Sequence, residues 1–207
     1  MIIAIDGPAA SGKGTLGKRL SDHFGLAHLD TGLLYRAVAR VMLDRELDLT
    51  DRDAAHQVAL DLDVTHLDDP RLRGAQMGEA ASVISGYQPV RDALLAFQRQ
   101  FAEQPPGAVL DGRDIGTVVC PRADVKLFIT AAPEERARRR HLELQKRGEQ
   151  IAYETILDDI RRRDERDMNR STAPLKPAAD AVTLDTTHLD ADAAFRKALD
   201  LVQARRS

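Results

Sequence analysis

The first 24 residues constrain the fold of this chain more than any other segment. Residues 1–6 form an uncharged, β-branched run until its last position, which is typical of a buried strand, and Gly7-Pro8 ends the run. In residues 13–24, apolar side chains recur at every fourth position, which predicts an amphipathic helix terminated by Gly25. A loop bearing glycines therefore connects a buried strand to the start of a helix.

This loop has the spacing G-x-x-x-x-G-K. Its glycines allow backbone N–H groups to surround a phosphate, and the helix N-terminus adds a partial positive charge. Lys13 would bridge the β- and γ-phosphates of a nucleoside triphosphate. The bare motif arises by chance in roughly one chain in twenty of this length, but the flanking strand and helix make chance a poor explanation. The residues expected to bind ATP are Gly7, Pro8, Ala9, Ala10, Ser11, Gly12, Lys13, Gly14 and Thr15.

Two residues are candidates for contact with Mg²⁺, the cofactor expected alongside ATP as co-substrate. Gly14 occupies the usual Ser/Thr position of such a loop, and the hydroxyl follows one residue later, at Thr15, which could contact the ion directly or through water. Asp111 ends a predicted strand and could organise Mg²⁺ and water, although it could instead only cap the turn.

Composition and length exclude several classes of protein. The 30 Lys and Arg residues and 33 Asp and Glu residues leave a net charge of -3, so neither nucleic acid nor a membrane is an expected partner. The single cysteine, Cys120, and the lack of a signal peptide favour the cytoplasm. An Asn-Lys-x-Asp guanine-recognition loop is excluded, because the one asparagine, Asn169, precedes Arg170. Little chain remains for the coupling machinery of a motor or transporter.

The remaining chain alternates between predicted strands and helices. Further strands are expected at residues 26–29, 108–111, 125–129 and 181–184. Helices are expected to begin at Gly32, at the N-cap Thr50, at Pro133 and at the cap Asp190, and a further helix is expected over about residues 153–169. Another helical stretch is expected to be interrupted at Gly86 and Pro89. This alternation predicts an α/β fold of three layers, with a parallel sheet covered by helices on both faces, as in P-loop NTPases.

Four groups of arginines follow the glycine loop: Arg36; Arg113; Arg136, Arg138, Arg139 and Arg140; and Arg163 with Arg170. Arginine binds phosphate oxygens in pairs and keeps its charge, which suits a site where two phosphorylated molecules meet. Some arginines of the third group must be merely solvated, because they point in different directions around a helix. An acceptor phosphate is already ionised at neutral pH, so none of the six histidines is expected to be catalytic.

Several segments together resemble the bacterial cytidylate kinases over nearly the whole chain. They are residues 5–15, residues 29–36, the highly specific D-G-R-D-I-G-T-V-V string at 111–119, residues 163–167, Asn169-Arg170 and residues 173–175. The resemblance implies a single domain, 1–207, with a core of about residues 1–35, 107–140 and 170–207. It also implies a monophosphate-binding insertion at about 36–106 and a helical lid at about 141–157. Longer family members carry a β-rich insert near residues 65–77 that this chain is too short to contain in full.

The resemblance also implies roles for individual residues. The acceptor phosphate would be held by Thr31, Arg36 and Arg113. The cytosine would be bound by Ser82, Arg91, Asp114 and Arg170. The ribose or nearby phosphates would be held by Arg163 and Asp167. The residues expected to be catalytic are Lys13, Arg113 and Arg163.

The activity expected from residues and resemblance together is transfer of the γ-phosphoryl group of ATP to CMP or dCMP, in a monomeric enzyme. Cytosine presents an amino donor that suits the carboxylate of Asp114, whereas uracil presents a carbonyl there. A kinase for UMP or AMP is the nearest alternative. A nucleotide-binding regulator without catalysis is an alternative of a different class.

Overall fold

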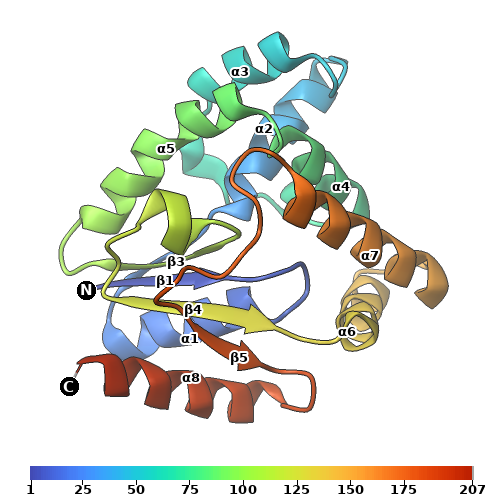
Figure 1. The fold of residues 1–207 in the computed structure, drawn as a ribbon. Helices are drawn as coiled ribbons and strands as arrows, with labels where there is room; N and C mark the ends of the chain where they lie inside the picture. The colour runs from blue at the N-terminus through green and yellow to red at the C-terminus, as the bar shows by residue number, and fades with distance from the viewer. Residues whose placement is uncertain (207) are drawn as a thin grey trace. The chain divides into compact units, whose positions relative to one another are not determined.

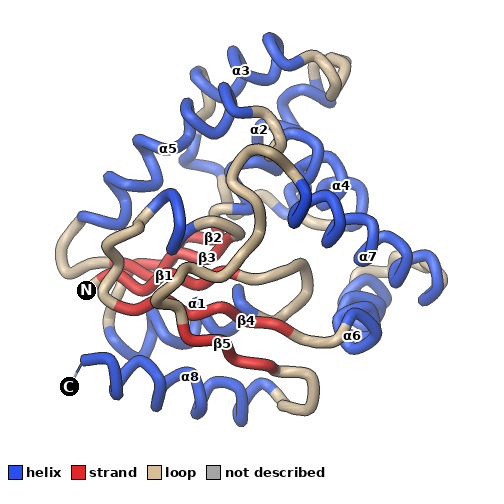
Figure 2. Tube along the Cα trace, viewed as in Figure 1, coloured by secondary structure: helices blue, strands red, loops and turns tan. Residues whose placement is uncertain are grey.

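A parallel five-stranded sheet organises the first of two compact units, which comprises Met1–Asp30 and the chain from Phe101 onward. The structure is a computed structural model that describes residues 1–206. The strand order is β2-β3-β1-β4-β5 (Figure 2). All neighbouring strands are parallel. The strands are β1 (Ile2–Asp6), β2 (Ala27–Asp30), β3 (Ala108–Gly112), β4 (Val125–Thr130) and β5 (Val182–Asp185). The α/β fold with a parallel sheet is thereby confirmed.

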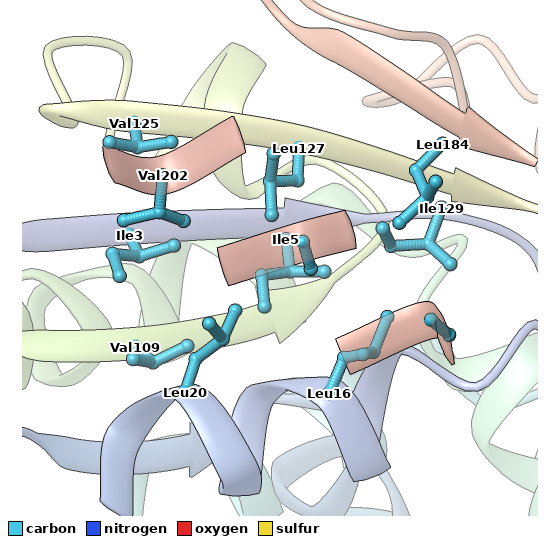
Figure 3. Close-up of a cluster of buried hydrophobic side chains, with 12 residues drawn as sticks. Ile3, Ile5, Leu16, Leu20, Val109, Val125, Leu127, Ile129, Leu184 and Val202 are labelled. Atoms are coloured by element: carbon cyan, nitrogen blue, oxygen red, sulfur yellow. The ribbon is translucent and has the colours of Figure 1, made fainter. Parts of the chain in front are cut away.

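One face of this sheet carries the main hydrophobic core. Side chains of a strand alternate between faces, so Ile3 and Ile5 of β1 share a face with Val109 of β3. They pack with Leu16 and Leu20 of α1 (Lys13–Phe24) and with residues of α8 (Ala191–Arg206), as Figure 3 shows. The two helices lie together beneath the strands in Figure 1.

The opposite face of β1 and β3 is contacted by η3 (Ile115–Val119), a single wide helical turn. The same alternation places Asp6 and Lys126 on this face, opposite to Ile5 and Leu127. The Lys126 stem lies against Gly116 of η3. Two buried charged residues therefore lie beneath η3, whereas the other face of these strands buries apolar side chains.

Two long helices of the first unit, α6 (Pro133–Lys146) and α7 (Tyr153–Asn169), pack against each other. The predictions of a helix from Pro133 and of a helix over 153–169 are confirmed. Arg170 follows the last residue of α7 in an extended conformation, so it does not continue the helix face that carries Arg163 and Asp167. The C-terminal helix is capped by Asp190 as expected, through a hydrogen bond from the Ala193 N–H to Oδ1.

The second unit, Thr31–Gln100, is helical throughout. Its elements are α2 (Gly32–Asp44), α3 (Arg52–Leu60), α4 (Ala75–Ile84), most of α5 (Gln88–Glu103) and the short 3₁₀ turns η1 (Val64–His66) and η2 (Pro70–Leu72). Helices α3 and α4 both pack on α2. The shortened segment around residues 65–77 therefore contains short turns and the start of α4, and no strand.

Two boundary predictions in this unit are wrong. The N-cap of α3 is Asp51 rather than Thr50, because the Asp51 carboxylate accepts hydrogen bonds from the N–H groups of Asp53 and Ala54. Pro89 does not interrupt a helix, since it is the second residue of α5, where a missing N–H costs no helical hydrogen bond. The predicted break at Gly86 is confirmed. No helix formed by the described residues is long and apolar enough to span a membrane.

Candidate active site

The glycine loop leaves the end of β1 and enters α1 through two positions that require glycine. Gly12 has φ 93°, a left-handed conformation that L side chains rarely adopt, and it is the N-cap of α1. A Cβ atom on Gly7 would collide with the carbonyl oxygen of Ile129 in β4. The Lys13 ammonium donates a hydrogen bond to the Pro8 carbonyl at 3.2 Å, so the lysine lies back over the loop.

Arginines of α6 stabilise this loop from behind. The buried Arg136 donates to the carbonyl of Ala9 at 3.2 Å and forms an ion pair with Asp164 of α7. Arg139 donates to the carbonyl of Ser11 at 3.3 Å and to the Thr186 carbonyl at 2.6 Å. Backbone oxygens thus engage both guanidinium groups, so these two arginines support the loop.

The other two arginines of α6 form ion pairs near their own helix turn. Arg138 is exposed and pairs with Glu135, and Arg140 pairs with Glu143. Of the four arginines of the third group, only Arg136 and Arg139 therefore contact the glycine loop.

Two carboxylates lie together beside the loop, at the carboxyl ends of neighbouring strands. Asp30 of β2 and Asp111 of β3 are register partners. Asp111 is 2% exposed, and its Oδ2 atom lies 2.9 Å from Nε2 of His28. Burial and the negative charge of Asp30 raise the pKa of Asp111, while the His28 hydrogen bond and Lys13 oppose that rise.

Two glycines of α1 create the space for this carboxylate. A Cβ on Gly17 would lie 2.8 Å from Nε2 of His28 and 3.4 Å from Oδ2 of Asp111. A Cβ on Gly14 would lie 3.8 Å from Oδ1 of Asp111. Gly14, the position that usually carries a hydroxyl, therefore faces Asp111, whereas Thr15 is exposed in the first turn of α1.

Lys13 interacts electrostatically with groups on both sides of the loop. Burial and the positive charge of Arg113 lower its pKa to about 7, with a smaller effect of Arg163 in the same direction. Asp111 and Asp30 act in the opposite direction. Two arginines on separate elements thus lie near enough to repel the lysine, and an anionic ligand would relieve that repulsion.

Arg113 belongs to a second cluster of charge, formed with the C-terminal half of α7. Its Nε donates to Oδ2 of Asp167 at 2.9 Å, and the Asp167 side chain is 5% exposed. Burial alone would raise the pKa of Asp167, but Arg113, Arg163 and Arg170 outweigh burial and hold the pKa below its ordinary value. Arg170 also donates through Nε and a terminal nitrogen to the Ala173 carbonyl. Four of the predicted acceptor-binding residues are therefore gathered in this cluster.

Asp114 and Cys120 border η3. Asp114 is its N-cap residue and is 5% exposed. Cys120 follows its last residue and is buried.

The remaining predicted acceptor residues belong to the second unit. Arg91 of α5 is 6% exposed, donates to the Ser85 carbonyl at 3.0 Å and has its guanidinium carbon 5.4 Å from the ring centroid of Tyr35. Ser82 of α4 is 5% exposed. Arg36 of α2 donates weakly to the Leu72 carbonyl at 3.5 Å, and Thr31 is buried at the start of α2.

The protein donors available for a metal ion are few. Among residues 1–206, no group of three or more His, Cys, Asp and Glu side chains could hold one. Asp30 and Asp111 nevertheless form a carboxylate pair beside Lys13. Mg²⁺ is commonly held by one or two carboxylates together with waters and substrate phosphates, so this pair fits Mg²⁺ accompanied by a nucleotide.

Sequence reasoning missed three residues of this site: Asp6, His28 and Asp30. Asp30 lies in the segment 29–36 that resembles the family, but its pairing with Asp111 depends on the register of β2 and β3. His28 reaches Asp111 only because Gly17 lies between them. The alternation of faces along β1 is the one sequence signal that could have separated Asp6 from the apolar core.

The parallel sheet and the glycine loop, with its lysine and neighbouring carboxylates, define a P-loop nucleotide kinase. The family model described as cytidylate kinase matches residues 3–204. A cytidylate kinase of Rhodopseudomonas palustris (strain TIE-1) is 60% identical over 207 residues, covering 100% of this chain and 98% of that protein. One of Methylocella silvestris is 61% identical over 204 residues, covering 99% and 94%. The chain belongs to the cytidylate kinase family.

A solved structure of a gluconokinase from Sinorhizobium meliloti is similar in fold, with a TM-score of 0.52 and 15% identity, over 98% of this chain and 91% of that one. At this identity the likeness concerns the fold alone. Family membership makes the protein a nucleoside monophosphate kinase, with nucleotides as substrates and ATP-dependent phosphoryl transfer as its reaction.

Proposed function

We propose that this enzyme transfers the γ-phosphoryl group of ATP to CMP or dCMP, giving ADP and CDP or dCDP, with residues 7–15 holding the triphosphate. The observation that carries the proposal is the convergence of Lys13 of α1, Arg113 after β3 and Arg163 of α7: both arginines lie within electrostatic reach of Lys13 and of Asp167. Such a convergence suits several phosphate groups brought into line. The identity of about 60% to cytidylate kinases over the whole chain supports cytosine as the base.

The reaction is an in-line displacement. An oxygen of the acceptor monophosphate forms a bond to the γ-phosphorus as the bond to the β–γ bridging oxygen breaks, and ADP leaves with that oxygen's electron pair. Lys13 would offset charge on the β- and γ-phosphates, and Arg113 and Arg163 would offset charge on the acceptor and the moving phosphoryl group. No general base is required, because the acceptor oxygen is already ionised.

Mg²⁺ belongs to this proposal as the cofactor. Asp111 and Asp30 would hold it together with the ATP phosphates, directly or through water, and Thr15 could contribute through water. When bound, the ion would neutralise charge on the β- and γ-phosphate oxygens.

The acceptor contacts that we propose are those expected from the sequence. Thr31, Arg36 and Arg113 are proposed to bind its phosphate. Ser82, Arg91, Asp114 and Arg170 are proposed to contact the cytosine, and Arg163 and Asp167 the ribose or nearby phosphates. The carboxylate of Asp114 would accept a hydrogen bond from the cytosine amino group, which uracil lacks.

The segment at about residues 141–157 is proposed as a lid that closes over both nucleotides and excludes water. It contains the end of α6, the connection to α7 and the start of α7. The rest of the chain is proposed to form a core, at about residues 1–35, 107–140 and 170–207, and a monophosphate-binding region, at about residues 36–106. We further expect the protein to be a cytoplasmic monomer without nucleic-acid or membrane partners. Light scattering after size exclusion would test the oligomeric state.

A panel assay tests the substrate. ADP release from ATP and Mg²⁺ is measured with CMP, dCMP, UMP and AMP in turn, and without any acceptor. Rapid release with CMP and dCMP alone is the expected result. Preference for UMP or AMP would overturn the choice of base, and ATP binding without turnover of any acceptor would favour a regulator.

A further inference from the structure

Asp6 is a buried carboxylate that the reaction above does not use. It is the last residue of β1, immediately before the glycine loop, and it is 4% exposed. Its neighbour Ile5 points into the apolar core, so Asp6 points to the other face of the sheet, where η3 lies. A buried charge in such a position is stable only where hydrogen bonds compensate for its lost hydration.

The compensating hydrogen bonds come from the backbone of η3. Oδ1 of Asp6 accepts from the Ile115 N–H at 2.7 Å, and Oδ2 accepts from the Gly116 N–H at 2.8 Å. Asp114, the N-cap residue of this turn, forms no capping hydrogen bond with its own side chain. Asp6 therefore provides the cap from a strand more than a hundred residues away in the sequence.

Space at this contact is limited. A Cβ on Gly116 would lie 3.3 Å from Oδ2 of Asp6 and 3.1 Å from Cδ of Lys126. The carboxylate can therefore meet both N–H groups only where the backbone of η3 lies closely over β1 and β4.

This contact joins the two segments to which the proposed function assigns the two nucleotides. Asp6 directly precedes the loop proposed to bind ATP, and the N–H groups it holds directly follow Arg113 and Asp114, proposed to bind the acceptor. We propose that Asp6 is a positioning residue that fixes Arg113 and Asp114 relative to the ATP-binding loop, an inference that rests on the proposed function.

The charges around Asp6 come from three elements. Asp114 before η3 repels it, Lys13 of α1 attracts it, and the stem of Lys126 of β4 lies beneath the same turn while its ammonium binds the Pro121 carbonyl and Asp180. Burial raises the pKa of Asp6 to about 6, although the hydrogen bonds from Gly116 and Ile115 oppose that rise. Asp6 is thus ionised at neutral pH and becomes protonated in mildly acidic solution, which weakens its bonds to both N–H groups.

The first test is spectroscopic and needs no substrate. In the unmodified protein, the amide proton shifts of Ile115 and Gly116 should follow the carboxyl ¹³C shift of Asp6 with one common midpoint as pH is lowered. In Asp6→Asn, both amide signals should move upfield and lose this pH response. Amide shifts that do not follow the Asp6 carboxyl would overturn the inference, and this measurement remains decisive if the variant fails to fold.

The second test is kinetic. Asp6→Asn should lower kcat/KM for CMP by about 10- to 100-fold, while KM for ATP changes by less than about 3-fold. Below about pH 6, kcat/KM for CMP should fall more steeply in the wild type than in the variant, because protonation of the CMP phosphate lowers both alike and protonation of Asp6 lowers only the wild type.

Asp124→Asn is the matched control, because the Asp124 carboxylate also accepts from a backbone N–H of β1, that of Ile2, at the other end of the strand. Its kcat/KM for CMP should equal that of the wild type. Equal losses toward ATP and CMP in Asp6→Asn would overturn the positioning role. If the wild type does not turn over CMP, the proposed function fails, while the amide shifts still decide whether Asp6 anchors η3.

Discussion

At the carboxyl ends of the strands, each face of the sheet carries a buried carboxylate, and the two carboxylates have different partners. On the α1 face, Asp111 contacts the side chain of His28 and lies near Lys13 and Asp30, all of which can adjust to a ligand. On the η3 face, Asp6 is engaged by two backbone N–H groups. Both residues are at most 4% exposed, so burial does not distinguish them. Their partners do: side chains surround Asp111, whereas backbone N–H groups hold Asp6, as the proposed positioning role requires.

The largest effect should come from Lys13→Ala on the α1 face. Removing the ammonium that would follow charge onto the moving phosphoryl group should lower kcat by about 10³-fold or more. The fold should persist, because the side chain is half-buried and its hydrogen bond is to a loop carbonyl. Steady-state kinetics and a thermal melt measure the two quantities. Substantial residual activity in a folded variant would contradict the role of Lys13.

On the η3 face, Asp6 should affect stability and activity in opposite directions as pH changes. Its native pKa of about 6 exceeds the ordinary 3.8, so its contribution to stability is full below 3.8 and lost as pH rises through 6. Relative to Asp6→Asn, the wild type should therefore lose about 3 kcal/mol of unfolding free energy between about pH 3 and pH 7.5. Denaturant titrations at several pH values measure this difference. A difference that does not vary with pH would show that the native pKa is not raised.

A smaller effect is expected at the border of η3 from Asp114→Asn. The amide can no longer present a full carboxylate to the cytosine amino group, so the ratio of kcat/KM for CMP to that for UMP should fall by about 100-fold. Competition between the two acceptors measures this ratio directly. An unchanged ratio would refute the assignment of Asp114 to the base.

The smallest of these effects should come from Gly17→Ala, because the added methyl group would push His28 away from Asp111. The new Cβ would lie 2.8 Å from Nε2 of His28, and overpacking of this kind should cost about 2 kcal/mol of unfolding free energy. Adding His28→Ala should restore part of this loss, because it removes the clashing ring. Lys18→Ala on the exposed side of α1 is the control and should leave stability unchanged. Additive losses in the double variant would mean that the clash lies elsewhere.

Local chemistry explains what could be predicted from the sequence. The extents of α1, expected over residues 13–24, and of α7, expected over about residues 153–169, agree with the structure. The strands were predicted to within about one residue at each end, because β-branched runs bounded by turn residues leave few alternatives. The helix cap at Asp51 was missed by one position, since Thr50 and Asp51 both suit an N-cap and only the backbone conformation distinguishes them.

The sequence by itself determined the glycine loop between a strand and a helix, the parallel α/β class and the family, because each depends on residue types at short, fixed spacings. Only the tertiary structure decided which charged groups meet: Asp30 with Asp111, Asp6 with η3, and Arg136 and Arg139 with the back of the loop. These contacts join residues between 81 and 128 positions apart. The contacts of Asp30, Asp111 and Asp6 depend on strand register and on the face of the sheet, and a shift of one residue would move each side chain to the other face. Those of Arg136 and Arg139 depend on which side of α6 faces the loop.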